Sequence, residues 1–122
     1  MTEDFTSAAT IADLVAAKRG TKGHPEAQLT VDVFRAGDTL IIQSAIAGVS
    51  GKDLDVAIAK DTVTIKGQRQ SSSEYESDHY YHRELHWGKF SRSIILPFDI
   101  DVNRAKATLK GGILTIRLPR LK

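Results

Sequence analysis

Hydrophobic and polar residues alternate with a period of two along most of the chain, most clearly in residues 104–119. Two alternating runs flank the pair Gly111–Gly112, and their apolar members are Ala105, Ala107, Leu109, Leu114, Ile116 and Leu118. This period is typical of half-buried strands, and two glycines between such runs favour a tight turn in which both central residues take positive φ. Pro119 ends the second run because proline cannot donate to a strand ladder. The stretch predicts a β-hairpin.

The same period recurs upstream in shorter runs. We expect strands over residues 29–34, 40–46, 54–58 and 63–67, and a further one from Phe90 to Leu96. Turn residues separate these runs at intervals of about 8 to 12 residues, and none of the runs has a helical period. The pattern therefore predicts an all-β fold of the sandwich type.

Residues 1–28 follow a different pattern and contain one helix candidate. Thr10 is suited to be its N-cap, and Asp13 stands three residues later as in a capping box. A helix of about nine residues is marginal in water and needs a surface to pack on. Two interpretations stay open for this segment. It is either a frayed tail or an arm that contacts a partner or non-native protein through Phe5, Ile11, Leu14 and Val15.

The interval 68–89 breaks the strand rhythm, because 22 residues without a core pattern are too many for a hairpin loop. Its first half is polar. Its second half, residues 80–87, has the aromatic content of a short strand. A strand on so long a tether need not pair with its own sheet.

Three motifs in order resemble the signatures of the small heat-shock proteins of the Hsp20/alpha-crystallin family. The pattern A-x-x-x-x-G-[IV]-L occurs at 107–114, F-x-R-x-x-x-L-P at 90–97, and Gly48-Val49 is followed by Asp-Leu-Asp-Val at 53–56. The resemblance covers residues 29–119. One departure is Ala47, which stands where the family usually carries a proline.

The resemblance implies an immunoglobulin-like β-sandwich over 29–119, an N-terminal arm and linker over 1–28, and a short end at 120–122. In bacterial and plant members, the segment corresponding to 68–89 crosses to a second subunit and pairs with its first strand, which implies a homodimer here. The implied interface residues are Tyr80, Tyr81, Arg83, Glu84, Leu85, Trp87, Arg92, Val31 and Val33.

Arg92 shares the parity of the apolar residues Phe90, Ile94 and Leu96. A permanent charge that points toward an apolar side requires a partner, and Glu84 in the tethered segment is the expected carboxylate. The alternative is that Arg92 extends its guanidinium to solvent.

The resemblance also implies a shallow groove between the strands 54–58 and 105–109, which would bind client proteins. Its residues would be Val56, Ile58, Ala105, Ala107 and Leu109. The alternative is that these are ordinary core residues. Family members fill this groove with an I-x-[IV] tail beyond the last strand, and no such motif follows Pro119. We therefore expect dimers or small oligomers and a groove open to other segments, such as residues 11–15.

Composition narrows the classes of function. The chain has no cysteine, so it has no disulfide and no thiolate nucleophile, and a reducing, cytoplasmic setting is expected. It has neither an apolar run of 18 residues nor a basic, apolar N-terminus, which argues against a membrane span or a signal peptide. The formal net charge of +2 comes from scattered lysines and arginines, so no nucleic-acid partner is expected.

The sequence contains parts of metal-binding and phosphate-binding motifs but no complete one. His79, His82, His86, Asp78 and Glu84 suggest a metal site, but in a strand only His82, Glu84 and His86 share a face, and surface or interface histidines are the favoured interpretation. The sequence around Gly51-Lys52 lacks the other residues of a phosphate-binding loop, and there is no G-x-S-x-G motif. We expect no cofactor, no metal and no enzymatic activity.

The resemblance implies an ATP-independent holdase of the stress response, which binds partly unfolded polypeptides, suppresses their aggregation and leaves refolding to ATP-dependent chaperones. The alternative is an adaptor similar to CS-domain co-chaperones, which binds a folded partner. That class typically lacks the long segment 68–89. A third class, a metal-dependent hydrolase using His82 and His86, would require bound metal.

Overall fold

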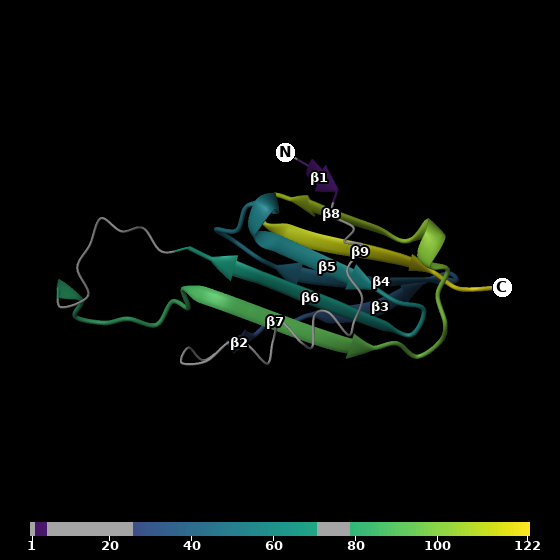
Figure 1. The fold of residues 1–122 in the computed structure, drawn as a ribbon, viewed down its shortest axis with the longest axis horizontal. Coiled ribbons are helices and arrows are strands. Elements are labelled where there is room, and N and C mark those ends of the chain that lie inside the picture. The colour runs from purple at the N-terminus through teal and green to yellow at the C-terminus, as the bar shows by residue number, and fades with distance from the viewer. Residues whose placement is uncertain (1, 5–25, 71–78) are drawn as a thin grey trace.

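The computed structural model describes residues 2–4, 26–70 and 79–122, and within them nine strands form two stacked sheets (Figure 1). The five-stranded sheet has the order β1 (Thr2–Asp4), β8 (Lys106–Lys110), β9 (Ile113–Pro119), β4 (Thr39–Ala45) and β3 (Asp32–Ala36). The four-stranded sheet has the order β2 (Ala27–Gln28), β7 (Gly88–Ile95), β6 (Thr62–Arg69) and β5 (Leu54–Ile58). Two short 3-10 helices, Gly51–Asp53 and Val102–Arg104, lie in the connections. The predicted all-β sandwich is confirmed.

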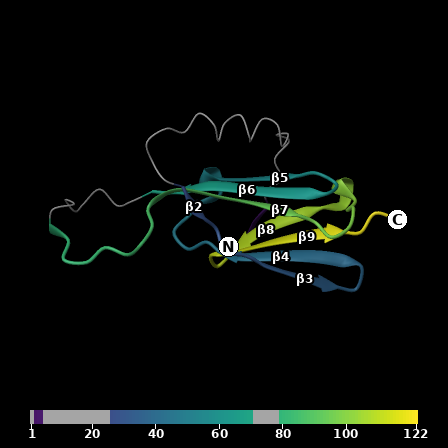
Figure 2. The ribbon, with the colours of Figure 1, turned by 90° about the horizontal axis from the view of Figure 1, so that it is seen from below.

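The core lies between the two sheets, which Figure 2 shows as separate layers. Alternate residues of strands such as β8 and β9 point into it, as the period of two requires. On β9, for example, Leu114, Ile116 and Leu118 are fully buried, whereas Ile113 and Arg117 are exposed and Thr115 is half-buried. Other buried members come from both sheets and include Leu40, Ile42, Leu54, Val56, Val63, Ile65, Phe90, Ile94, Ala107 and Leu109.

The predicted hairpin is confirmed as β8 and β9, which pair antiparallel from Lys106↔Arg117 to Lys110↔Ile113. Gly111 has φ 58° and Gly112 has φ 79°, the left-handed conformation that a two-residue primed turn needs. The carbonyl of Gly112 also accepts a hydrogen bond of 2.6 Å from the Ile46 amide, which joins the turn to the end of β4.

The first predicted strand, residues 29–34, is wrong as a single element. Ala27–Gln28 form β2, which pairs parallel with β7, while β3 begins at Asp32 in the other sheet. The chain changes sheets between them: the Leu29 amide donates to the Ser91 carbonyl of β7 at 3.1 Å, and the Ser44 hydroxyl of β4 donates to the Thr30 carbonyl at 2.7 Å. Alternation of Leu29, Val31 and Val33 continues through this crossing, so the pattern does not reveal it.

Residues 79–87 form no strand in the single chain. They consist of a 3-10 position at His79 followed by bends and irregular backbone, and β7 begins at Gly88. A strand needs a neighbour to accept and donate its backbone hydrogen bonds, and none of the strand pairings among the described residues includes this segment. The N-terminal helix candidate, from Thr10, lies outside the described residues.

Candidate functional site

The outer edge of β3 is the first feature that asks for a functional explanation. All five residues of this strand are exposed, and it pairs only with β4 in the part of the chain that the structure describes. Val33 stands opposite the buried Ile42, so it belongs to the inner face of the sheet, yet it is 42% exposed. Its outward neighbour Phe34 is 43% exposed. Backbone groups along such an edge are free to pair with another strand.

The second feature is the projecting arm, which we define as residues 79–87. Both views show this green segment running out beyond the end of the sandwich (Figures 1 and 2). Its apolar side chains are exposed, with Tyr81 fully so and Leu85 at 73%. Two contacts within the arm are local: the Arg83 guanidinium lies 4.7 Å from the Tyr80 ring centroid, and His82 Nε2 lies 2.8 Å from Glu84 Oε2. Exposed aromatic and aliphatic groups on one projecting segment are typical of an interaction site.

The base of the arm is better packed than its tip. His86 and Trp87 are half-buried, and His86 Nε2 donates to the Lys89 carbonyl at 2.9 Å. The Arg69 guanidinium donates to the His86 carbonyl at 3.1 Å. The arm is therefore hydrogen-bonded to the sandwich at its base, whereas Tyr81 and Leu85 further out are exposed.

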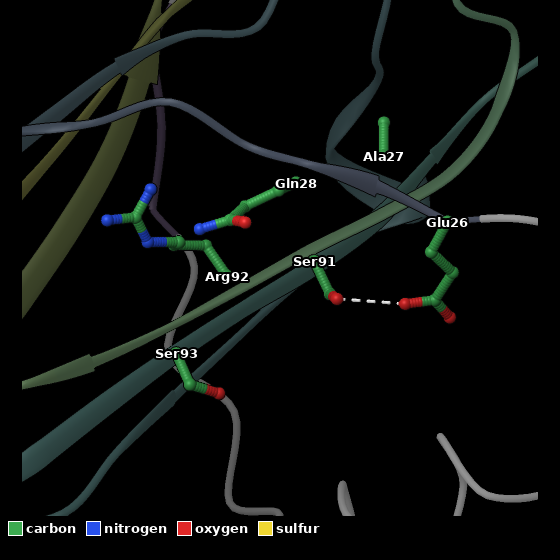
Figure 3. Close-up of a pocket in the computed structure, with 6 residues that line it drawn as sticks. All are labelled: Glu26, Ala27, Gln28, Ser91, Arg92 and Ser93. Atoms are coloured by element: carbon green, nitrogen blue, oxygen red, sulfur yellow. Dashed lines mark hydrogen bonds between the residues drawn. The ribbon is translucent and has the colours of Figure 1, made fainter.

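A polar pocket of about 370 Å³ lies beside β2 and β7 (Figure 3). It is lined by Glu26, Ala27, Gln28, Ser91, Arg92 and Ser93. The Ser91 hydroxyl donates to Glu26 Oε2 at 2.8 Å, while the buried Glu26 Oε1 has no hydrogen-bond partner among the described residues. Arg92 projects to the other side of β7 and donates from Nη1 to the Leu29 carbonyl at 3.0 Å.

Arg92 therefore has a carbonyl partner in the single chain, and Glu84 is paired with His82. The predicted pairing of Arg92 with Glu84 belongs to a dimer and stays a prediction. The other predicted interface residues fall into two groups: Tyr80, Tyr81, Arg83 and Leu85 are exposed on the arm and Val33 on β3, whereas Val31 and Trp87 are half-buried.

Most of the predicted groove is core. Val56 and Ala107 are fully buried, Leu109 is 6% exposed, and all three belong to the central cluster between the sheets. Their strands lie in opposite sheets, so their side chains meet across the sandwich instead of lining its surface. Ile58 and Ala105 are half-buried and pack against the same cluster. A client-binding role stays a prediction for the groove residues, and Ile58 and Ala105 are the more accessible of them.

The structure places β1 where the sequence analysis leaves an open groove. Thr2, Glu3 and Asp4 pair antiparallel with Lys110, Leu109 and Thr108, so this edge of β8 is covered. Three residues are too few to show an alternating pattern, and the sequence carries no signal for this pairing. The suggested occupant, residues 11–15, lies outside the described residues, as do Phe5 and the other predicted arm contacts.

No metal centre emerges from the described ranges: no three His, Asp or Glu side chains gather in a group able to hold an ion. His82 is adjacent to Glu84, but His86 bonds to the Lys89 carbonyl instead.

In the same ranges, no helix has the length and apolar character to cross a membrane.

Comparison with known proteins gives consistent matches. The Hsp20/alpha crystallin family model matches residues 32–122. Spore protein SP21 of Stigmatella aurantiaca is 32% identical over 99 residues, covering 81% of this chain and 59% of that protein. Small heat shock protein C2 of Rickettsia felis is 34% identical over 89 residues, covering 73% and 58%. The chain thus spans about three fifths of the length of these two relatives.

Solved structures agree. Heat shock protein 16.0 from Schizosaccharomyces pombe superposes with a TM-score of 0.69 at 31% identity, over 80% of this chain and 90% of that one. The hspA structure from Xanthomonas axonopodis gives a TM-score of 0.70 at 25% identity, over 79% and 96%. The small heat-shock proteins are chaperones and not enzymes, so no catalytic site is expected in this fold. The motifs, the sandwich and these matches together establish that the chain belongs to the Hsp20/alpha crystallin family.

Proposed function

We propose that this protein forms a homodimer in which each arm pairs with the β3 edge of the other subunit. The observation that carries the proposal is that one molecule presents both halves of the contact, an exposed edge strand and a projecting apolar segment, without joining them. Two-fold symmetry lets both contacts form at once, since each subunit supplies one arm and one edge.

The energetics suit a stable but reversible dimer. Each backbone hydrogen bond across the new strand pair contributes about 0.5–1.5 kcal/mol net. Burial of the exposed Tyr81 and Leu85 adds about 1.5–3 kcal/mol for a fully covered large side chain. Symmetry doubles every contribution, which offsets the entropy of ordering two arms.

The dimer would act as an ATP-independent holdase for partly unfolded polypeptides. Exposed apolar groups bind non-native chains without catalytic residues, and binding to the unfolded state withholds it from aggregation. Ile58, Ala105 and the N-terminal residues Phe5, Ile11, Leu14 and Val15 are the proposed client contacts. We place this activity in the cytoplasm, with refolding left to ATP-dependent chaperones.

Sedimentation velocity over a wide range of protein concentration tests the dimer. We expect a reversible monomer–dimer equilibrium, weakened by Leu85→Ser on the arm. Ile95→Ser is the matched control, because Ile95 is 86% exposed but lies on β7. A chain that stays monomeric at every concentration would favour the adaptor similar to CS-domain proteins.

Light scattering of a heat-denatured enzyme tests the holdase. An equimolar amount of this protein should delay the rise in scattering in the absence of ATP. An equal amount of an inert protein serves as the control. Scattering curves identical with and without the protein would contradict the proposal, even if the dimer forms.

A further inference from the structure

Arg69 occupies the point at which the arm departs from the sandwich. It is the last residue of β6, and its partner in the ladder is Gly88, the first residue of β7. Residues 70–87 therefore form the whole connection between these strands, and Arg69 is the last side chain of the regular ladder before it.

The Arg69 side chain joins three parts of the molecule. Its Nε donates to the Ala47 carbonyl at 2.7 Å, its Nη1 donates to the His86 carbonyl at 3.1 Å, and its guanidinium carbon lies 5.8 Å from the centroid of the buried Phe90 ring. Ala47 belongs to the connection between the two sheets, and His86 to the base of the arm. A guanidinium suits this task because its donors are held in one rigid plane.

The backbone beside this contact turns sharply. Gly88 has φ +117°, a conformation that side chains disfavour, and the His86 ring closes the corner through its bond to the Lys89 carbonyl. The chain bends at Gly88, and the hydrogen bond from Arg69 to the His86 carbonyl joins the residues before this bend to the sandwich. Without that bond, rotation at residues 86–88 would let the arm swing.

We infer that Arg69 is a positioning residue for dimer formation. It fixes the direction of the arm in the free chain, so that less conformational freedom is lost when the arm binds the partner subunit. This inference rests on the proposed dimer. It states that the Arg69 side chain holds the arm in its binding direction before the partner subunit is bound. Arg69 itself need not touch the partner subunit.

Distance measurement between spin labels tests the direction of the arm without reference to function. The chain has no cysteine, so His82→Cys on the arm and Lys60→Cys on the body can be labelled without background. At a concentration far below the dissociation constant of the dimer, the doubly labelled chain should give one narrow distance distribution. R69A should lose that narrow peak, and R69K should be intermediate because an ammonium lacks the planar fork. R104A, which removes a solvent-exposed contact with Asp101, is the matched control and should keep it.

The dissociation constant of the dimer is measured on the same variants, at a temperature where circular dichroism shows each to be folded. R69A should weaken the dimer roughly tenfold, because the released arm must be ordered again on binding, while R104A matches the parent. A distribution that stays narrow in R69A, or an R69A dimer as tight as the parent, overturns the inference. If the parent chain is monomeric, the proposed dimer fails, and the spin-label distances alone decide the role of Arg69.

Discussion

The two edges of the five-stranded sheet end in opposite ways. At one edge, β8 is covered by β1, and its inward side chains Ala107 and Leu109 are buried in the core. At the other edge, β3 has five exposed residues, and Val33 is open to solvent although it belongs to the inner face. The edge over the filled core is closed by the chain itself, whereas the β3 edge is open in the described residues.

This difference separates stability from association. Residues at the β8 edge contribute to folding because they lose their contact with water within one chain. Residues at the β3 edge contribute little until a partner arrives, because their surface is still hydrated. Substitutions at the two edges should therefore change different measured quantities.

The largest expected effect comes from removing the arm. Since Arg69 and Gly88 are paired, replacing residues 70–87 by Asn-Gly closes β6 and β7 with a two-residue primed turn. The resulting chain should keep its sandwich and lose the dimer, with a dissociation constant raised by about 1,000-fold or more, the loss of some 4 kcal/mol. Analytical ultracentrifugation measures the change, and far-UV circular dichroism checks the fold. A dimer of unchanged affinity would show that the arm does not form the dimer contact.

The sequence predicts the strands of the sandwich well, but it does not predict which edges of the five-stranded sheet are covered. Alternation of buried and exposed positions is local information, and it locates β5, β8 and β9 almost residue for residue. The change of sheet at Leu29–Val31 was missed because it preserves that alternation. Val56 and Ala107 are buried, as the core alternative expects, and their parity is the same in a core and in a groove, so the groove stays a prediction. The pairing of β1 depends on a contact distant in sequence, between Thr2–Asp4 and Thr108–Lys110.

A pair of matched truncations compares the two edges directly. Leu109→Ala, under the closed edge, should lower the free energy of unfolding by about 2–4 kcal/mol, since it leaves a cavity in the core. Val33→Ala, at the open edge, should lower it by less than about 1 kcal/mol, because its side chain is already partly hydrated. Urea denaturation of both variants in the arm-deleted chain measures these values without interference from the dimer. Equal losses at the two sites would remove the distinction between the edges.

Unpairing β1 should make the two edges alike. Replacing Thr2–Asp4 by three prolines removes every backbone donor of β1, so the strand cannot stay on β8. The β8 amides that face β1 should then exchange with solvent about tenfold faster, which corresponds to roughly 1.4 kcal/mol of local protection. Hydrogen exchange followed by NMR measures this, with the amides of β6 as the internal control. Unchanged exchange at Thr108–Lys110 would show that β1 does not close this edge in solution.

The smallest expected effect concerns the ion pair at the tip of the arm. In the single chain Glu84 contacts His82, and both side chains are 80% exposed, so Glu84→Gln should leave the stability of the sandwich unchanged within measurement. If Glu84 instead meets Arg92 of the partner in the dimer, the same substitution should weaken the dimer about twofold, near 0.5 kcal/mol. Arg92→Gln removes the charge but keeps a donor for the Leu29 carbonyl, so a double-mutant cycle with Glu84→Gln isolates the pair. A coupling energy of zero in that cycle, with dimerisation intact, would mean that Glu84 and Arg92 do not meet and that the arm binds in another register.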